Sequence, residues 1–164
     1  MKLAIIGTGK IVHEAFKALQ SVKNIEVKAL YVRAHSIEKA RELARSYQVD
    51  SIYTDYDKLL QTAAIDTVYI GLVNSAHYDY SRRALEAGKH VIIEKPFCST
   101  AAQTQELADL ARSKKLYIFE AVTFLHVHPF IGKINFHTID IRNRFSLMSS
   151  FNFFQNHIHI CFGK

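Results

Sequence analysis

Strand-like and helix-like patterns alternate along the first 121 residues, and this alternation constrains the fold more strongly than any other feature. Strand-like runs occupy residues 2–6, 25–32, 53–54, 67–72, 91–93 and 116–121. Several are apolar without alternation, which is typical of parallel strands that are covered on both faces. The segments between them repeat apolar residues at spacings of three and four, as helices do. The sequence therefore predicts an α/β fold, a doubly wound parallel sheet with right-handed crossovers.

A glycine turn separates the first predicted strand from the first predicted helix. Gly7, Thr8 and Gly9 follow the strand directly, and the helical pattern begins after them. Gly7 permits a tight turn, Gly9 lets a pyrophosphate approach the backbone, and the helix N-terminus offers free N–H groups. The third glycine position of the dinucleotide-binding pattern is Val12, which we expect to weaken the packing of the helix at the turn. A glycine turn with a purely structural role is the alternative.

Polar side chains follow the fourth and fifth predicted strands. Glu94 and Lys95 end the fifth strand, which Pro96 stops because it has no N–H for a ladder. Asn74 and His77 follow the fourth strand. Ligands of open α/β sheets bind at the carboxyl ends of the strands, so a lysine there can act as a charge, a hydrogen-bond donor or a proton relay. The alternatives are a solvated Glu94–Lys95 pair, and cap or surface roles for the other two residues.

The second predicted strand bears on the choice of cofactor. An NAD-preferring site carries an Asp or Glu about 20 residues after the glycines. Here Tyr31 and Val32 occupy that region, Arg33 follows, and His35 is nearby. No carboxylate repels a 2′-phosphate and a guanidinium can hold one, so NADP is favoured over NAD. A loop arginine that faces solvent is the alternative for Arg33.

Composition and charge exclude several classes of protein. The net charge of +6 is divided between residues 1–132 and 133–164 and forms no single basic stripe, which argues against nucleic-acid binding. We expect no membrane span, because no apolar stretch reaches about 18 residues, and we find no signal-peptide pattern. Cys98 and Cys161 lie far apart without metal-ligand spacing, so we expect no metal and a reducing cytoplasm.

Four motifs together resemble the Gfo/Idh/MocA family of NAD(P)-dependent oxidoreductases. They are GTGKI after the first strand, NSAH after the fourth, ALEAGKHVIIEKPF through the fifth and FEAV in the sixth, of which the third is the most specific. The resemblance covers residues 1 to about 130 and implies a Rossmann-type fold. It also implies hydride transfer at a nicotinamide, with a sugar, polyol or related hydroxy compound as the small-molecule substrate.

The resemblance also implies roles for individual residues. Lys95 is the implied catalytic residue, beside the nicotinamide, where it assists binding and proton handling; Glu94 supports the site and Pro96 follows in a peptide bond that is often cis. Asn74 and His77 are expected to flank the nicotinamide ribose. The full set of expected cofactor contacts is Gly7, Thr8, Gly9, Lys10, Ile11, Arg33, Asn74, His77, Glu94, Lys95 and Pro96.

The C-terminal part departs from the family pattern. Members carry a C-terminal α/β substrate domain that usually supplies a catalytic Asp and His. Here residues 1–121 are expected to form the NAD(P)-binding domain, 122–132 the start of the substrate domain, and 133–164 an aberrant or poorly ordered tail. The tail has no sustained periodicity and would suit an out-of-frame reading of AT-rich coding sequence. Without a partner carboxylate or cysteine, a metal site at His126 and His128 is the weaker interpretation.

Two functions remain open at this point. The first is an oxidoreductase of this family in a truncated and catalytically incomplete form, which could form a homo-oligomer if the second domain were present. The second is a non-catalytic dinucleotide-binding module whose tail serves as an interaction segment.

Overall fold

The computed structural model describes residues 1–62, 64–123, 134–137 and 158–159. Its central feature is a parallel sheet whose strands run in the order β3-β2-β1-β4-β5-β6. These strands are β1 (Lys2–Ile6), β2 (Glu26–Tyr31), β3 (Ser51–Tyr53), β4 (Thr67–Ile70), β5 (His90–Glu94) and β6 (Ile118–Thr123). The strand order reverses between β1 and β4, which confirms the predicted doubly wound fold. In open α/β sheets, ligands bind at such a reversal point.

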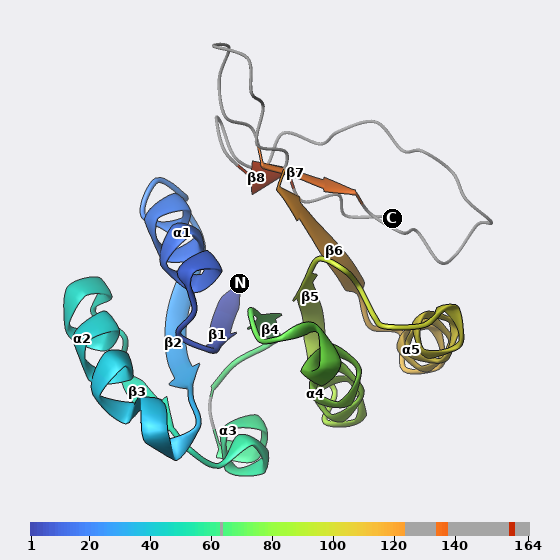
Figure 1. The fold of residues 1–164 in the computed structure, drawn as a ribbon, viewed down its shortest axis with the longest axis horizontal. Coiled ribbons are helices and arrows are strands. Elements are labelled where there is room, and N and C mark those ends of the chain that lie inside the picture. Colours follow the sequence, from blue (N-terminus) through green and yellow to red (C-terminus); the bar gives the residue numbers. More distant parts are fainter. Residues whose placement is uncertain (63, 124–133, 138–157, 160–164) are drawn as a thin grey trace.

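Helices cover both faces of the sheet. Figure 1 shows α1 (Lys10–Leu19) and α2 (Ile37–Tyr47) on one face, and α3 (Tyr56–Thr62), α4 (Asn74–Glu86) and α5 (Ala101–Ser113) on the other. A 3-10 turn, η1 (Ala34–Ser36), precedes α2. Because each crossover connects parallel strands of the same sheet, every helix starts near the carboxyl edge of the sheet. The two groups of helices therefore enclose the strands and leave their carboxyl ends accessible.

The helix ends follow the residue types that the sequence provides, with some exceptions. Thr100 caps α5 by accepting the N–H of Gln103 at 3.2 Å, and Asp55 caps α3 by accepting the N–H of Lys58 at 3.1 Å. Gly88 follows α4 with a φ of +76°, as expected for a residue that ends a helix in the left-handed conformation. Thr100 and Gln103 have the spacing of a capping box, but only half of it is formed, because the Gln103 Oε1 is buried without a partner among the described residues. Ser36 is the N-cap residue of α2 but its side chain makes no capping hydrogen bond, although serine is a preferred N-cap residue.

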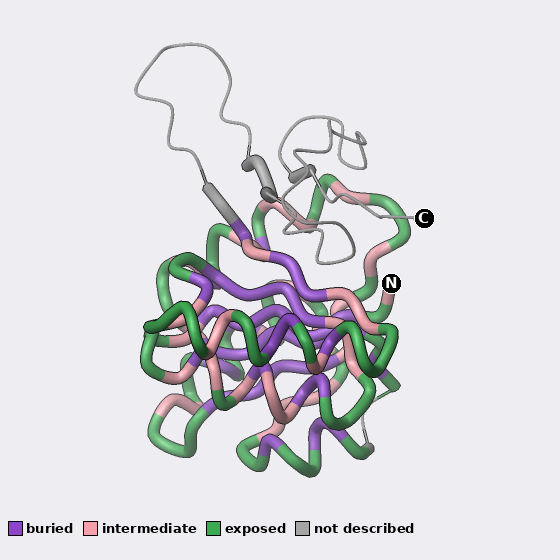
Figure 2. Tube along the Cα trace, turned by 90° about the vertical axis from the view of Figure 1, so that its right-hand side faces the viewer, coloured by how far each residue is buried: buried purple, intermediate pink, exposed green. Residues whose placement is uncertain are grey.

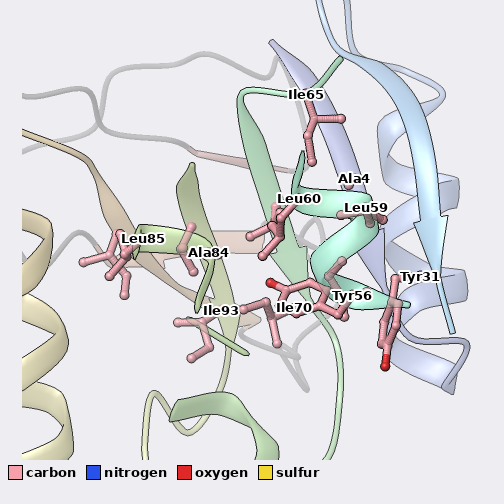
Figure 3. Packing of buried hydrophobic residues seen from close by; sticks show 14 of the residues in the cluster. Ala4, Tyr31, Tyr56, Leu59, Leu60, Ile65, Ile70, Ala84, Leu85 and Ile93 are labelled. Carbon is pink, nitrogen blue, oxygen red and sulfur yellow. The ribbon is translucent and has the colours of Figure 1, made fainter. Parts of the chain in front are cut away.

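The hydrophobic core lies in two layers, one on each face of the sheet. Figure 2 shows buried residues along the central strands and exposed residues on the outer sides of the helices. The layer beneath α3, α4 and α5 contains alternate residues of each strand together with helical leucines and tyrosines (Figure 3). The other layer packs the remaining strand residues against α1 and α2. Burial on both faces explains why the strand sequences lack polar alternation.

The packing of α1 corrects one expectation from the sequence. Val12 was expected to weaken the contact between the helix and the glycine turn, yet its side chain is fully buried. The residue opposite is Gly71, where an added Cβ would lie 2.7 Å from the Val12 Cγ2. The helix α1 therefore still packs closely, because the glycine that makes room is Gly71, in the segment after β4, and not a residue of the helix. The expectation was wrong because it considered one partner of the contact.

The C-terminal part contributes two further strands to the sheet. β7 (Ile134–His137) pairs antiparallel with β6, and β8 (Ile158–His159) pairs parallel with β7. Pattern analysis predicted neither strand. Residues 124–133, 138–157 and 160–164 lie outside the described part, so the predictions for 122–132, for the tail and for His126 and His128 stay predictions. Within the described ranges, no helix has both the length and the apolar character needed to cross a bilayer.

Candidate cofactor-binding site

The loops at the carboxyl edge of the sheet are joined by backbone hydrogen bonds. Gly7 donates its N–H to the carbonyl of Tyr31 at 2.9 Å, which links the loop after β1 to the end of β2. Gly71 donates to the carbonyl of Ile6 at 3.0 Å, which links the segment after β4 to the end of β1. The predicted binding residues therefore lie on adjacent, mutually supported loops at the reversal point of the strand order.

The two glycines of the first loop meet different constraints. Gly7 has a φ of +116°, and a Cβ there would lie 2.7 Å from the carbonyl oxygen of Gly71, so the turn requires glycine. Gly9 is exposed, has an ordinary extended conformation, and an added Cβ would meet no described atom within 4 Å. The space in front of Gly9 therefore faces away from the protein, where a ligand can approach the backbone.

The N-terminus of α1 is suited to an anion. Gly9 occupies the N-cap position without a side chain to cap the helix, and the first turn contains no acidic residue. The first N–H groups of a helix point along its axis and carry a partial positive charge, so an anion placed there gains both hydrogen bonds and dipole attraction. Thr8, just before the N-cap, is half-buried, and the first two helical residues, Lys10 and Ile11, are exposed and half-buried respectively.

Arg33 lies at the end of β2, beside the first loop. Its side chain is exposed, and among the described residues it forms no ion pair. Burial, together with a hydrogen bond to Tyr80, raises the pKa of the neighbouring Tyr31 to about 12, and the positive charge of Arg33 acts in the opposite direction. The nearby acidic residue of α2, Glu38, is paired with Arg41. The guanidinium is thus available to a ligand phosphate.

The turn after β5 presents Lys95 to solvent. Lys95 and Pro96 are exposed and are joined by the cis bond that the family resemblance implied. Glu94, directly before them, is buried and accepts a hydrogen bond from the Tyr69 hydroxyl at 2.5 Å. Burial raises the pKa of the Glu94 carboxyl, whereas the hydrogen bond from Tyr69 acts against that rise. Glu94 therefore supports the turn from within, and Lys95 is the group that can reach a ligand.

The two residues predicted after β4 occupy different environments. Asn74 is exposed at the first position of α4, a helix without a side-chain cap at its N-cap, Val73. His77 is completely buried, with its Nδ1 2.8 Å from the carbonyl oxygen of Pro96 and its Nε2 3.1 Å from that of Leu72. Asn74 thus lies at the edge with the other predicted residues, whereas His77 is buried between the loop after β4 and the turn after β5.

Sequence reasoning missed three residues of this region. Glu120, in β6, accepts the backbone N–H of Phe97 at 2.8 Å. Gly71 has no side chain and so leaves space for the side chain of Val12. Val73, at the start of α4, is a large apolar residue that is 60% exposed. The only sequence signal for Glu120 was a carboxylate within an otherwise apolar strand. In the part of the chain that the structure describes, no group of three or more His, Cys, Asp or Glu side chains is arranged to hold a metal ion.

Comparisons with known proteins agree with this geometry. Trans-1,2-dihydrobenzene-1,2-diol dehydrogenase of Xenopus tropicalis is 31% identical over 120 residues, which are 73% of this chain and 36% of that protein. The scyllo-inositol 2-dehydrogenase (NADP(+)) IolU of Bacillus subtilis is 30% identical over 127 residues, 76% of this chain and 38% of that protein. The chain therefore spans somewhat more than a third of the length of these curated relatives.

A solved structure shows the same similarity in three dimensions. The 3-ketoreductase KijD10 from Actinomadura kijaniata, in complex with NADP and TDP-benzene, superposes with a TM-score of 0.71 and 31% identity. The match covers 79% of this chain and 39% of that one. Residues 1–121 also match the family described as "Oxidoreductase family, NAD-binding Rossmann fold" (GFO_IDH_MocA). With this match, the doubly wound fold and the glycine turn at its reversal point, the chain belongs to the Gfo/Idh/MocA oxidoreductase family.

Proposed function

We propose that the chain binds NADP(H) across the carboxyl ends of β2, β1, β4 and β5. It would serve as the cofactor-binding part of an oxidoreductase that acts on a sugar, polyol or related hydroxy compound. The observation that carries this proposal is the N-terminus of α1, which is uncapped and faces open space at Gly9. Such an arrangement fits a pyrophosphate, because no side chain caps the helix and no described atom fills the approach at Gly9.

The proposed path of the cofactor follows the strand order. Arg33 follows β2 and Lys95 follows β5, so three interstrand spacings, roughly 14 Å, separate the two ends of the path. The glycine turn lies between them, on β1. Arg33 would hold the 2′-phosphate, the amides at Gly9 the pyrophosphate, and Asn74 and Lys95 the nicotinamide ribose. The exposed apolar side chain of Val73 would contact a ring of the cofactor.

Lys95 is the residue that we propose for the chemistry. The bound nicotinamide would supply the hydride acceptor or donor. The Lys95 ammonium, exposed beside it, would donate a hydrogen bond to the reacting oxygen of the substrate and assist the movement of its proton. The names of IolU and of the KijD10 complex both include NADP, which supports the proposed cofactor. Their names, an inositol dehydrogenase and a 3-ketoreductase, support a hydroxy or keto compound as the substrate.

The proposed partners follow from the same interpretation. A small-molecule substrate is proposed, without nucleic acid or membrane, because the charged side chains of the described helices are largely paired with each other. The cytoplasm is the proposed location, which suits the free thiol of Cys98. A homo-oligomer is proposed only for a chain in which the second domain of the family is present. The alternative function is a non-catalytic dinucleotide-binding module, which would bind the cofactor at the same site.

Gly9→Ala tests the cofactor path. The added methyl group meets no described atom, and the backbone conformation of Gly9 suits alanine, so the stability should not change. The methyl group would however stand where the pyrophosphate approaches, and the Kd for NADPH should rise at least about tenfold, as expected for a lost charge-assisted contact. Fluorescence titration measures the Kd and urea unfolding the stability. Unchanged affinity in a folded variant would refute the proposed path.

Arg33→Ala tests the preference for NADP over NAD. A charge-assisted hydrogen bond to a phosphate contributes about 1.5–3 kcal/mol, so the ratio of the two affinities should fall by roughly 10- to 100-fold. The affinity for NADH should change little, because the 2′-hydroxyl offers no charge. Equal affinities of the wild-type chain for the two cofactors, or an unchanged ratio in the variant, would contradict the role of Arg33.

A further inference from the structure

The turn that carries Lys95 is held by a side chain at each of three consecutive residues. Glu94 Oε2 accepts the backbone N–H of Lys95 at 3.3 Å. The ring of His77 lies 2.8 Å from the carbonyl oxygen of Pro96, and Glu120 Oε1 accepts the N–H of Phe97 at 2.8 Å. The three side chains come from β5, α4 and β6. The backbone on either side of the lysine is thus fixed by three separate elements.

These side chains reach the turn from both faces of the sheet. Side chains alternate between faces along a strand. Ile92 and Phe119 belong to the core layer of α1 and α2, and Ile93 belongs to the layer of α3, α4 and α5. Glu94 therefore points to the first face, where it meets Tyr69, and Glu120 points to the second face. The turn is held between them as well as from α4.

We propose that His77 and Glu120 are positioning residues that fix the Lys95 amine at the cofactor. This inference rests on the proposed function, because it assumes that Lys95 contacts the cofactor. It differs from the role expected from the sequence for His77, a direct contact with the ribose, and it assigns a role to Glu120, which had none. Neither residue touches the ligand in this arrangement. Each acts through a peptide group next to Lys95.

The chemistry of the contacts explains why these residue types are suited to the task. A carboxylate only accepts hydrogen bonds, so Glu120 can form a charge-assisted hydrogen bond with the Phe97 N–H, which holds the backbone of the turn in place. His77 is completely buried and faces a carbonyl oxygen at each ring nitrogen, so the single N–H of a neutral imidazole donates to one of these two oxygens while the ring packs against both. One oxygen belongs to the turn after β5 and the other to Leu72, in the loop after β4. His77 therefore lies between the two loops and fills the space that separates them.

A double-mutant cycle separates positioning from general stabilisation. Lys95→Met should raise the Kd for NADPH by about tenfold, as expected for one lost charged hydrogen bond. Glu120→Ala should raise it several-fold in the wild-type background and leave it unchanged in the Lys95→Met background, because there is no amine left to misplace. Glu120→Gln should restore the affinity to near the wild-type value, because its amide oxygen still accepts the Phe97 N–H. His77→Phe should behave as Glu120→Ala does.

Controls make each outcome decisive. Glu42→Ala removes an exposed carboxylate on α2 and should leave the Kd unchanged. If Glu120→Ala fails to fold, Glu120→Asp replaces it, since aspartate keeps the charge but has a shorter reach. A wild-type chain that does not bind NADPH would contradict the proposed function itself. This inference alone would be overturned if Lys95→Met weakens NADPH binding but the Glu120 variants do not. It would also be overturned if the effects of Glu120→Ala and Lys95→Met on the Kd simply add.

Discussion

The contact between Val12 and Gly71 predicts that a single methyl group destabilises the domain. Gly71→Ala would place a Cβ 2.7 Å from the Val12 Cγ2 and 3.2 Å from a ring carbon of Tyr69. Carbon atoms prefer a separation of about 3.5–4.0 Å, so the helix must retreat by about 1 Å or Val12 must leave its preferred rotamer. Gly71 has no positive φ, so alanine brings no backbone strain of its own.

The magnitude follows from this geometry. Overpacking of a core by one methyl group typically costs about 1–3 kcal/mol, which is the loss expected for Gly71→Ala. Val12→Ala alone should cost about 2 kcal/mol, because it removes two buried methyl groups at about 0.8 kcal/mol each and leaves a small cavity. In the double variant the new methyl group enters the space that valine vacates. Its stability should therefore equal or exceed that of Val12→Ala, which gives a coupling energy of about 1–3 kcal/mol.

Urea unfolding followed by circular dichroism measures all four proteins of this cycle. Gly9→Ala provides a matched control, since its Cβ meets no described atom and the unfolding free energy should stay within about 0.5 kcal/mol of wild type. The steric argument fails if Gly71→Ala is as stable as wild type. It also fails if the two single effects simply add in the double variant.

Two further predictions concern titratable groups away from the site. The Nδ1 of His90 accepts the Tyr117 N–H, and burial lowers the pKa of this histidine from its usual value of 6.5. The folded state therefore binds a proton at His90 more weakly than the unfolded chain does. The unfolding free energy should therefore fall as the pH drops from about 7.5 to about 5.5. It should fall less in His90→Asn, which keeps a hydrogen-bond acceptor. Equal pH dependence of the unfolding free energy in the two proteins would contradict this. Burial also raises the pKa of the Cys98 thiol to about 11, so iodoacetamide should alkylate it on the order of 100-fold more slowly than free cysteine near pH 7.5. Peptide mass spectrometry follows the reaction at this residue, and a rate like that of free cysteine would show that the thiol is not buried in solution.

The general fold was predictable because the patterns that determine it are local. Apolar runs, helical spacing and turn residues each depend on neighbours in the chain, and parallel topology then brings the ends of the strands to one edge. For this reason Gly7, Gly9, Arg33 and Lys95 could be assigned to a common edge from their positions in the sequence. The strands β7 and β8 were not predicted, because the sequence from residue 133 onward shows neither a sustained helical nor a sustained strand pattern.

The parts of the site that were missed depend on contacts between distant segments. The sequence contains a glycine at position 71 and a valine at position 12, but nothing local shows that they touch. His77 was correctly placed after the fourth strand, whereas its burial depends on how α4 docks against the turn after β5. Glu120 likewise meets Phe97 only because β6 lies beside β5.

The helix caps carry a consequence for the stability of the domain. Asp55 and Thr100 cap α3 and α5, whereas α1, α2 and α4, which begin along the proposed cofactor path, have no side-chain cap. A cap contributes about 1 kcal/mol to the stability of a helix, so the domain without ligand forgoes this amount at the helix starts nearest the ligand. A bound pyrophosphate or ribose would act as the missing cap. The melting temperature should therefore rise with the logarithm of the NADPH concentration, and the domain would resist degradation best in cells whose cofactor pool is full.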